Sequence, residues 1–156
     1  FIDISDKKLE DKVKKAEMFE ALRNKEYEKA AAAAQAVLEK KFVDIEAHLV
    51  CSIAFREMKN VEKYAFHNFV MKGLVDSILG SGDGKATETA FIVIETGEEY
   101  ALLGMIGSEV VRQSLIKSNG HSYDKMETKH RKTGEPAVFF FNVDIPFNWL
   151  NKQFKK

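Results

Sequence analysis

The chain has 156 residues, of which 45 % are hydrophobic, so it has the length of one domain and can bury a core. Lys plus Arg and Asp plus Glu both number 24, and this balance argues against a nucleic-acid partner. Cys51 is the only cysteine, which excludes an internal disulfide and a zinc site built from cysteines. No apolar run approaches the roughly 18 residues of a membrane span.

The first half of the sequence predicts helices arranged as a repeat. The segment Lys25–Ala30 recurs 34 positions later as Lys59–Tyr64. Apolar spacing predicts a helix ending near Leu22, a second at about 27–38, a third from an N-cap at Asp44 to Met58, and a fourth ending at Leu79. This helix–turn–helix period is that of tetratricopeptide repeats, which the first half resembles. Two repeats are fewer than the three usually needed, so another element must cap them.

The fourth predicted helix carries apolar side chains nearly all round. They are Tyr64, Phe66, Phe69, Val70, Met71, Leu74, Val75 and Ile78. A helix that is apolar on every side is buried on every side. We therefore expect this helix to lie between the repeat and the sheet that follows, and residues 1–156 to form a single compact domain. Its helical half is predicted at 5–79 and its sheet half at 80–156.

The second half predicts a small sheet. The segments are a buried strand at 90–95, a short helix between Gly97 and Gly107, a hairpin of 109–118 with 121–130, a strand at 137–143, and a last helix from Asp144. The whole chain is thus predicted to be α+β, with helical hairpins packed on a mainly antiparallel four-stranded sheet and a short C-terminal helix.

The predicted hairpin turns at Asn119-Gly120, the strongest two-residue hairpin signal, because both positions accept positive φ. If Ser118 faces His121, then Arg112 faces Glu127 and Ile116 faces Tyr123. The other face of the hairpin, with Val111, Leu115 and Met126, is assigned to the core. The strand 137–143 is apolar on both faces, and we expect it to be central and covered.

Three segments of the second half carry a family resemblance. They are Ser81–Gly84 leading into Glu88–Phe91, then Glu98–Leu103, and finally Phe140–Phe147. Between about residues 59 and 150 the chain resembles the bacterial family called domain of unknown function 4919. The resemblance implies a periplasmic or secreted protein, and it supplies no catalytic residue. The chain begins with Phe1, and we expect that an export signal preceded it.

Two surfaces are candidate binding sites for a protein or peptide. The first is the helix face with Tyr27 and Ala34, and the second is the loop with Ser81, Asp83 and Lys85. The plainer interpretation of this loop is that it ends a helix, with the Asp83 carboxylate accepting hydrogen bonds from loop amides and glycines supplying positive φ.

The histidines offer two further chemical possibilities. His48 lies one helical turn from Cys51, which places a base near a thiol, but a packed and inert thiol is the favoured interpretation. His121, Asp124, Glu127 and His130 alternate between the two faces of a strand, so they cannot converge on a metal. No metal or cofactor is predicted.

The favoured function is a non-catalytic interaction module of the bacterial cell envelope, because repeat-like helices commonly receive peptides and no catalytic motif is found. One alternative is a small hydrolase-type enzyme with a site between helices and sheet. Its candidate residues are Asp83, Glu88, Glu99, Tyr100 and His121. Another alternative is an inhibitor or immunity-type protein that plugs the site of its partner.

Overall fold

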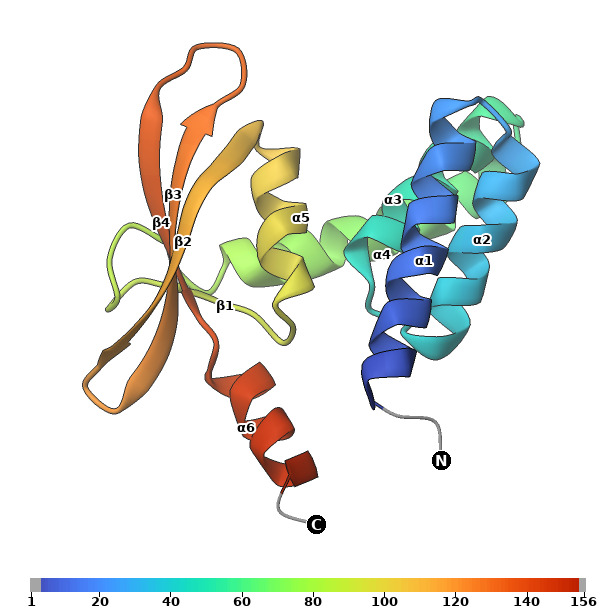
Figure 1. Ribbon diagram of the computed structural model, residues 1–156. Helices are drawn as coiled ribbons and strands as arrows, with labels where there is room; N and C mark the ends of the chain where they lie inside the picture. Colours follow the sequence, from blue (N-terminus) through green and yellow to red (C-terminus); the bar gives the residue numbers. More distant parts are fainter. Residues whose placement is uncertain (1–3, 155–156) are drawn as a thin grey trace. The chain divides into compact units, whose positions relative to one another are not determined.

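The computed structural model describes the backbone of residues 4–154 and the side chains of residues 6–152, and its first half consists of helices (Figure 1). The helices are α1 (Ile4–Arg23), α2 (Tyr27–Lys40), α3 (Ile45–Glu57) and α4 (Val61–Leu79). The chain divides into two compact units whose boundary falls within α4. Residues up to Leu74 form the helical unit, and residues from Val75 form the sheet unit.

The two copies of the sequence repeat end their first helices with the same turn. Lys25 and Lys59 occupy corresponding positions and both adopt positive φ, 60° and 59°. The amide that follows each lysine donates to a carbonyl five residues earlier, at 2.9 Å in both turns, from Glu26 to Ala21 and from Asn60 to Phe55. This is the Schellman arrangement, which satisfies the last carbonyls of a helix. The repeated sequence therefore encodes a repeated helix–turn–helix structure.

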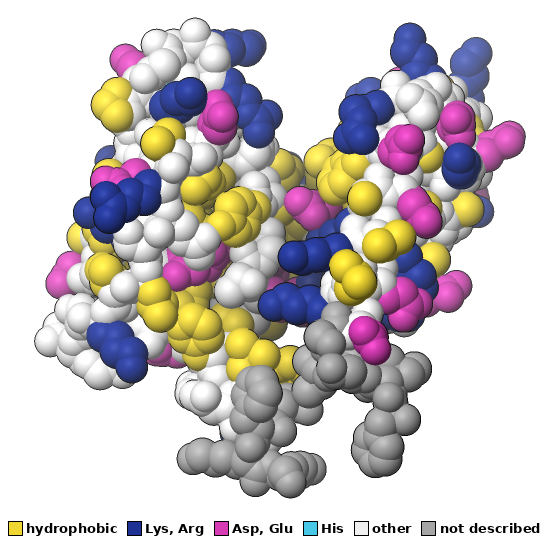
Figure 2. Space-filling model, viewed as in Figure 1, with side chains coloured by type: hydrophobic (Ala, Val, Ile, Leu, Met, Phe, Trp, Pro, Cys, Tyr) yellow, Lys and Arg dark blue, Asp and Glu magenta, His cyan; other side chains and the backbone are white. Residues whose placement is uncertain are grey.

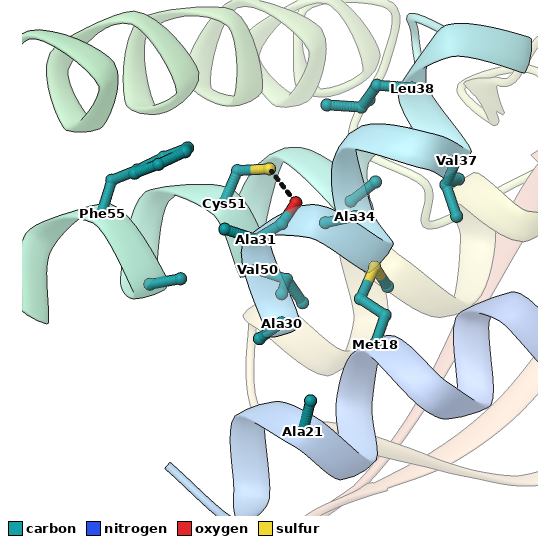
Figure 3. Close-up of a cluster of buried hydrophobic side chains, with 12 residues drawn as sticks. Met18, Ala21, Ala30, Ala31, Ala34, Val37, Leu38, Val50, Cys51 and Phe55 are labelled. Carbon is teal, nitrogen blue, oxygen red and sulfur yellow. Dashed lines mark hydrogen bonds between the residues drawn. The ribbon is translucent and has the colours of Figure 1, made fainter. Parts of the chain in front are cut away.

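Small side chains let the helices of the first unit approach closely. Ala30 and Ala34 of α2 and Ala47 of α3 are fully buried, and Met18 of α1 packs into the same cluster (Figure 3). Alanine also has the highest helix propensity, so the alanine-rich α2 is favoured locally and by packing. Asp44 caps α3, because its carboxylate accepts a hydrogen bond from the Ala47 amide at 3.0 Å.

The prediction that the fourth helix is buried on every side is wrong. Phe66 is 51 % exposed and Phe69 is 79 % exposed, and His67 and Ile78 are the only fully buried residues of α4 among those described. The neighbouring α3 reaches one face of α4, where the His67 ring stacks on Phe55 with centroids 5.6 Å apart. Although α4 carries apolar side chains on all sides, other elements do not cover all of its sides.

The second unit confirms the α+β class. Its elements are β1 (Phe91–Ile92), α5 (Gly97–Met105), β2 (Ser108–Ser118), β3 (His121–His130), β4 (Pro136–Asn142) and α6 (Asp144–Phe154). The strand order is β1-β4-β3-β2. The pairs β2–β3 and β3–β4 are antiparallel, whereas β1 runs parallel to β4, so the sheet is mixed. The helix α5 packs beside β2 (Figure 1).

The hairpin register is confirmed at every predicted pair. Ser118 faces His121, Arg112 faces Glu127 and Ile116 faces Tyr123. The turn residues Asn119 and Gly120 have φ of 49° and 78°, as a type I′ turn requires.

The core assignment of the hairpin is confirmed for Met126, which is fully buried, and wrong for two residues of β2. Val111 is 65 % exposed and Leu115 is 53 % exposed. Val111 lies in a β-bulge between Val110 and Arg112, where it faces no residue of β3. Leu115 belongs to the edge strand of the sheet, where a side chain has neighbours on one flank only. Of the described helices, none combines the length and apolar content needed to cross a membrane.

Candidate functional site

The most unusual chemistry of the sheet unit lies between α5 and the sheet, where two acidic residues are buried together. Consecutive residues of a helix point about 100° apart, so the acids of the first turn of α5 have different surroundings. Glu98 turns back and accepts hydrogen bonds from the amides of Ile94 at 2.7 Å and Glu95 at 3.3 Å. Glu99 is fully buried, and Asp124 of β3 is only 3 % exposed.

A chain of hydrogen bonds leads from this acid pair to the surface. The side-chain amide of Gln113, on β2, donates a hydrogen bond from Nε2 to Asp124 Oδ2 at 2.8 Å. The Tyr100 hydroxyl donates to Gln113 Oε1, and the Tyr100 side chain is exposed. Two residues of α5 are thus linked to Asp124. Glu99 lies near it in the interior, and Tyr100 is connected to it through Gln113 of the edge strand β2.

The environment of Glu99 favours its neutral form. Neither of its carboxyl oxygens accepts a hydrogen bond from a described residue, and a hydrogen bond with the Asp124 side chain requires that Glu99 carry a proton. Burial, together with the nearby carboxyls of Asp124 and Glu98, raises the pKa of Glu99 to about 9. Burial and the two acids of the buried pair, Glu99 and Asp124, also raise the pKa of the Tyr100 hydroxyl. No base is among the groups that shift Glu99, so at neutral pH this carboxyl retains its proton.

A neutral carboxyl beside a second carboxyl is the arrangement that enzymes use for acid–base chemistry. The structure therefore joins two of the residues that the sequence proposed for a hydrolase, Glu99 and Tyr100, and adds Asp124 and Gln113. It places Asp83 and Glu88 in the loop after α4, and His121 in a separate pair with Asp144 at 2.6 Å. Both acids of the buried pair are shielded from solvent, so a substrate reaches them only after a change of conformation.

The predicted binding loop brings Ser81, Asp83 and Lys85 together, but the polar side chains hold the loop itself. Asp83 Oδ1 accepts hydrogen bonds from the Lys85 amide at 2.9 Å and from the Thr89 hydroxyl at 2.6 Å. These bonds lower the pKa of Asp83. The Ser81 hydroxyl donates to the Ile78 carbonyl at 2.5 Å and accepts from the Ile92 amide at 2.8 Å. Lys85 is exposed.

Two glycines allow this loop to close against the sheet. A Cβ atom at Gly82 would lie 2.2 Å from the Thr89 carbonyl oxygen. Gly84 has φ +70°, and a Cβ atom there would lie 2.3 Å from the Phe91 ring. The Gly84 carbonyl accepts a hydrogen bond from the Phe140 amide of β4 at 2.8 Å. The loop thus packs against the sheet and is held by its own hydrogen bonds. This agrees with the interpretation that it serves to end the helix rather than to bind a partner.

The structure separates the two residues of the other predicted surface. Tyr27 is half-buried at a shallow depression of about 380 Å³, lined by residues 25–29 and Met58. Ala34 is fully buried in the core of the helical unit, so it offers no surface to a partner.

The helical unit contains a second buried polar pair that the sequence did not predict. The Nδ1 atoms of His48 and His67 lie 3.0 Å apart, and His48 Nε2 lies 2.7 Å from the Phe42 carbonyl oxygen. The sequence places His48 near Cys51 and favours a packed, inert thiol. Burial raises the pKa of the Cys51 thiol to about 11, and its Sγ lies 4.0 Å from the Ala31 carbonyl oxygen (Figure 3). This thiol is therefore packed and inert.

Aromatic side chains extend from this histidine pair to the surface. Phe42 is 56 % exposed, and its ring lies 6.5 Å from that of Phe66, centroid to centroid. Phe69 follows Phe66 by three positions, so both emerge on neighbouring parts of the α4 surface. We call Phe42, Phe66 and Phe69 the aromatic patch. Figure 2 shows that exposed hydrophobic side chains lie among charged ones on both units.

No group of three or more His, Cys, Asp or Glu side chains gathers as metal ligands would within residues 6–152. The fold and these sites define an α+β protein that combines a two-copy helical repeat with a small mixed sheet. The chain matches the model of the family described as domain of unknown function (DUF4919) over residues 3–152, and it belongs to that family. This confirms the resemblance and extends it through the helical half. No curated protein and no solved structure matches the chain.

Proposed function

We propose that this protein is a non-catalytic interaction module that binds a polypeptide segment presenting apolar side chains. The observation that carries the proposal is the aromatic patch. Its three phenylalanines come from two different segments, the turn before α3 and the helix α4, and each is more than half exposed. Adjacent exposed aromatics are unfavourable in water, and they are enriched where proteins bind one another.

The chemistry of the patch suits an apolar segment of a partner. Phenylalanine rings offer large rigid contact areas that lose little conformational entropy on binding. The charged residues that flank the patch in sequence have both signs: Lys41 and Asp44 lie around Phe42, and Glu62, Lys63 and Lys72 lie on α4. They therefore do not select a highly charged ligand. Apolar contacts therefore supply the affinity, and the rings that touch each other, Phe42 and Phe66, form its centre.

The place of action belongs to the same proposal. The family resemblance implies export, so the protein acts in the periplasm or outside the cell. Fractionation of the source bacterium with an antibody against the protein tests this location. Recovery of the protein with cytoplasmic markers alone would refute it.

Selection from a displayed peptide library, followed by affinity measurements, tests the binding function. We expect selected peptides to be rich in apolar residues, and Phe66→Ser and Phe69→Ser to weaken their binding at least tenfold, since hot-spot aromatics contribute about 2 kcal/mol or more. Leu9→Ser is the matched control, because Leu9 is 62 % exposed on α1 and lies outside the patch. Peptides that bind all four proteins equally would contradict the proposal.

A second candidate function rests on the buried acid pair. In a small hydrolase, the neutral Glu99 would serve as the proton donor and Asp124 as its partner, with Tyr100 and Gln113 at the entrance. A panel of ester, peptide and glycoside substrates tests this function. The matched variants are Asp124→Asn, which must abolish any activity found, and Glu88→Gln in the exposed loop, which must retain it.

A further inference from the structure

The hydrogen bonds of the histidine pair fix where its protons lie. His48 Nε2 faces a carbonyl oxygen, that of Phe42 at 2.7 Å, so this nitrogen must carry a proton. In a neutral imidazole the other nitrogen is then an acceptor. His48 Nδ1 therefore accepts from His67 Nδ1 at 3.0 Å, and His67 carries its proton on Nδ1. Two neutral rings therefore satisfy both of these contacts.

Neither ring can accept a second proton at no cost. A proton on His48 Nδ1 keeps the bond between the rings only if the proton of His67 moves to its Nε2, and it then charges the buried His48 ring; protons on both Nδ1 atoms, 3.0 Å apart, break the bond. A proton on His67 Nε2 would keep that bond but would charge a ring that is only 6 % exposed. Each route thus charges a buried ring, and charging both rings also breaks the bond between them, so protonation favours a conformation in which the rings have moved.

The charged groups around the pair do not compensate for this cost. Asp44, at the N-cap of α3, favours a charge on His48, but Lys15 lies 2.8 Å and Lys41 lies 3.6 Å from its carboxylate. Lys63 of α4 opposes a charge on His67, and so does His48 itself. Burial is the largest influence on both rings, and it lowers the pKa of His48 and the pKa of His67.

The rings of the aromatic patch lie directly on the histidines. The Phe42 ring meets His48 edge-on at 5.2 Å, and the Phe66 ring meets His67 edge-on at 5.1 Å, centroid to centroid. Phe42 also supplies the carbonyl oxygen that His48 binds. Movement of either histidine thus displaces a ring of the patch or the backbone that carries it.

From this geometry we infer that the His48–His67 pair is a proton-sensitive support of the aromatic patch, which holds its ligand at neutral pH and releases it under mildly acidic conditions. The inference that a ligand is released rests on the proposed binding function. The coupling between the histidines and the patch needs no ligand and can be tested in the free protein. By linkage, a patch that needs neutral histidines binds more weakly once they take up protons.

The coupling is tested first in the free protein. The ring carbons of phenylalanine and the imidazole nitrogens are followed by NMR between pH 7.5 and 5. We expect the Phe42 and Phe66 signals to shift together with the titration of His48 and His67. Ring signals that stay unchanged while the histidines titrate would overturn the inference, and this result does not depend on any ligand.

The second measurement uses a peptide selected at pH 7.5. We expect its affinity for the native protein to fall about tenfold at pH 5.5, within the usual range of coupling between sites. In the double variant with His48→Gln and His67→Asn no imidazole remains at the pair, so most of the pH dependence should vanish. His121→Gln removes an exposed histidine of the sheet unit and should keep the whole dependence.

The two proposals fail in different ways. A native protein that binds no peptide through Phe66 at pH 7.5 refutes the binding function and leaves the NMR coupling to stand or fall alone. An affinity that depends on Phe66 but is the same at pH 7.5 and 5.5, or that falls equally in the double variant without His48 and His67, refutes the switch.

Discussion

Replacing Glu99 with Gln should stabilise the sheet unit at neutral pH. The pKa of Glu99 is about 9 in the folded protein against 4.5 in an unfolded chain. Because the pKa of Glu99 is higher in the folded state than in the unfolded state, the stability that Glu99 contributes is complete below pH 4.5. This contribution is lost as pH rises towards 9. At pH 7 this loss amounts to roughly 3 kcal/mol as an upper estimate. Gln imitates the neutral carboxyl at every pH, so Glu99→Gln should be more stable than the native protein at pH 7 by up to that amount.

Urea unfolding at pH 5, 7 and 8.5 measures the effect. Trp149 is the only tryptophan and belongs to the sheet unit, so its fluorescence reports on the unit that contains Glu99. The native protein should lose stability from pH 5 to 8.5, whereas Glu99→Gln should stay nearly level. Glu88→Gln, at an exposed site in the same unit, should follow the native protein. If Glu99→Gln is no more stable at pH 7 and keeps the native pH slope, Glu99 is ionised in the folded state and the reasoning is refuted.

Two substitutions and one labelling experiment test the packing. Gly82→Ala places a methyl group 2.2 Å from the Thr89 carbonyl oxygen, so it should destabilise the sheet unit by about 2 kcal/mol or more in the same fluorescence assay. Asp44→Ala removes the α3 cap and the partner of Lys15, and should lower the helical unit's melting temperature by an amount equivalent to about 1–2 kcal/mol. Cys51 should react with a thiol reagent in the native protein at a rate set by unfolding, and much faster in urea; rapid reaction without denaturant would contradict its burial.

Local signals in the sequence predicted the hairpin and the repeat correctly. The pair Asn119-Gly120 specifies its own turn, and a two-residue turn fixes the register of the strands it joins. The two lysine turns at Lys25 and Lys59 follow from helix ends that are similar in sequence. In each case the information lies within a few residues of the structure it determines.

The errors arose where burial depends on distant partners. The composition of α4 shows that its faces are apolar but does not show which of them meets α3, so the exposure of Phe66 and Phe69 could not be read from it. A bulge is an irregularity of pairing, and nothing in the alternating pattern around Val111 announces one.

The acid pair was only half predictable. Glu99 and Tyr100 were among the candidates for a site between helices and sheet, but Asp124 and Gln113 were not. One signal was present: the correct hairpin register places Gln113 and Asp124 on the same face as Met126, which was assigned to the core. Asp124 is buried there, and a buried polar group needs partners, so its position should have pointed to Gln113 and to Glu99. The histidine pair had no such signal, because it depends on how α3 and α4 meet.

The two buried pairs make the two units respond to pH in opposite directions. The lowered pKa values of His48 and His67 mean that the helical unit gains stability as pH rises towards the ordinary imidazole value of about 6.5. The raised pKa of Glu99 means that the sheet unit loses stability as pH rises from 4.5. Between pH 5 and 6.5, therefore, amides of α3 should become better protected from hydrogen exchange and amides of β3 less protected, after correction for the intrinsic effect of pH on exchange. Protection that changes in the same direction in both elements would show that one of the two pairs is ionised in the native state, and the element with the unexpected slope would identify which.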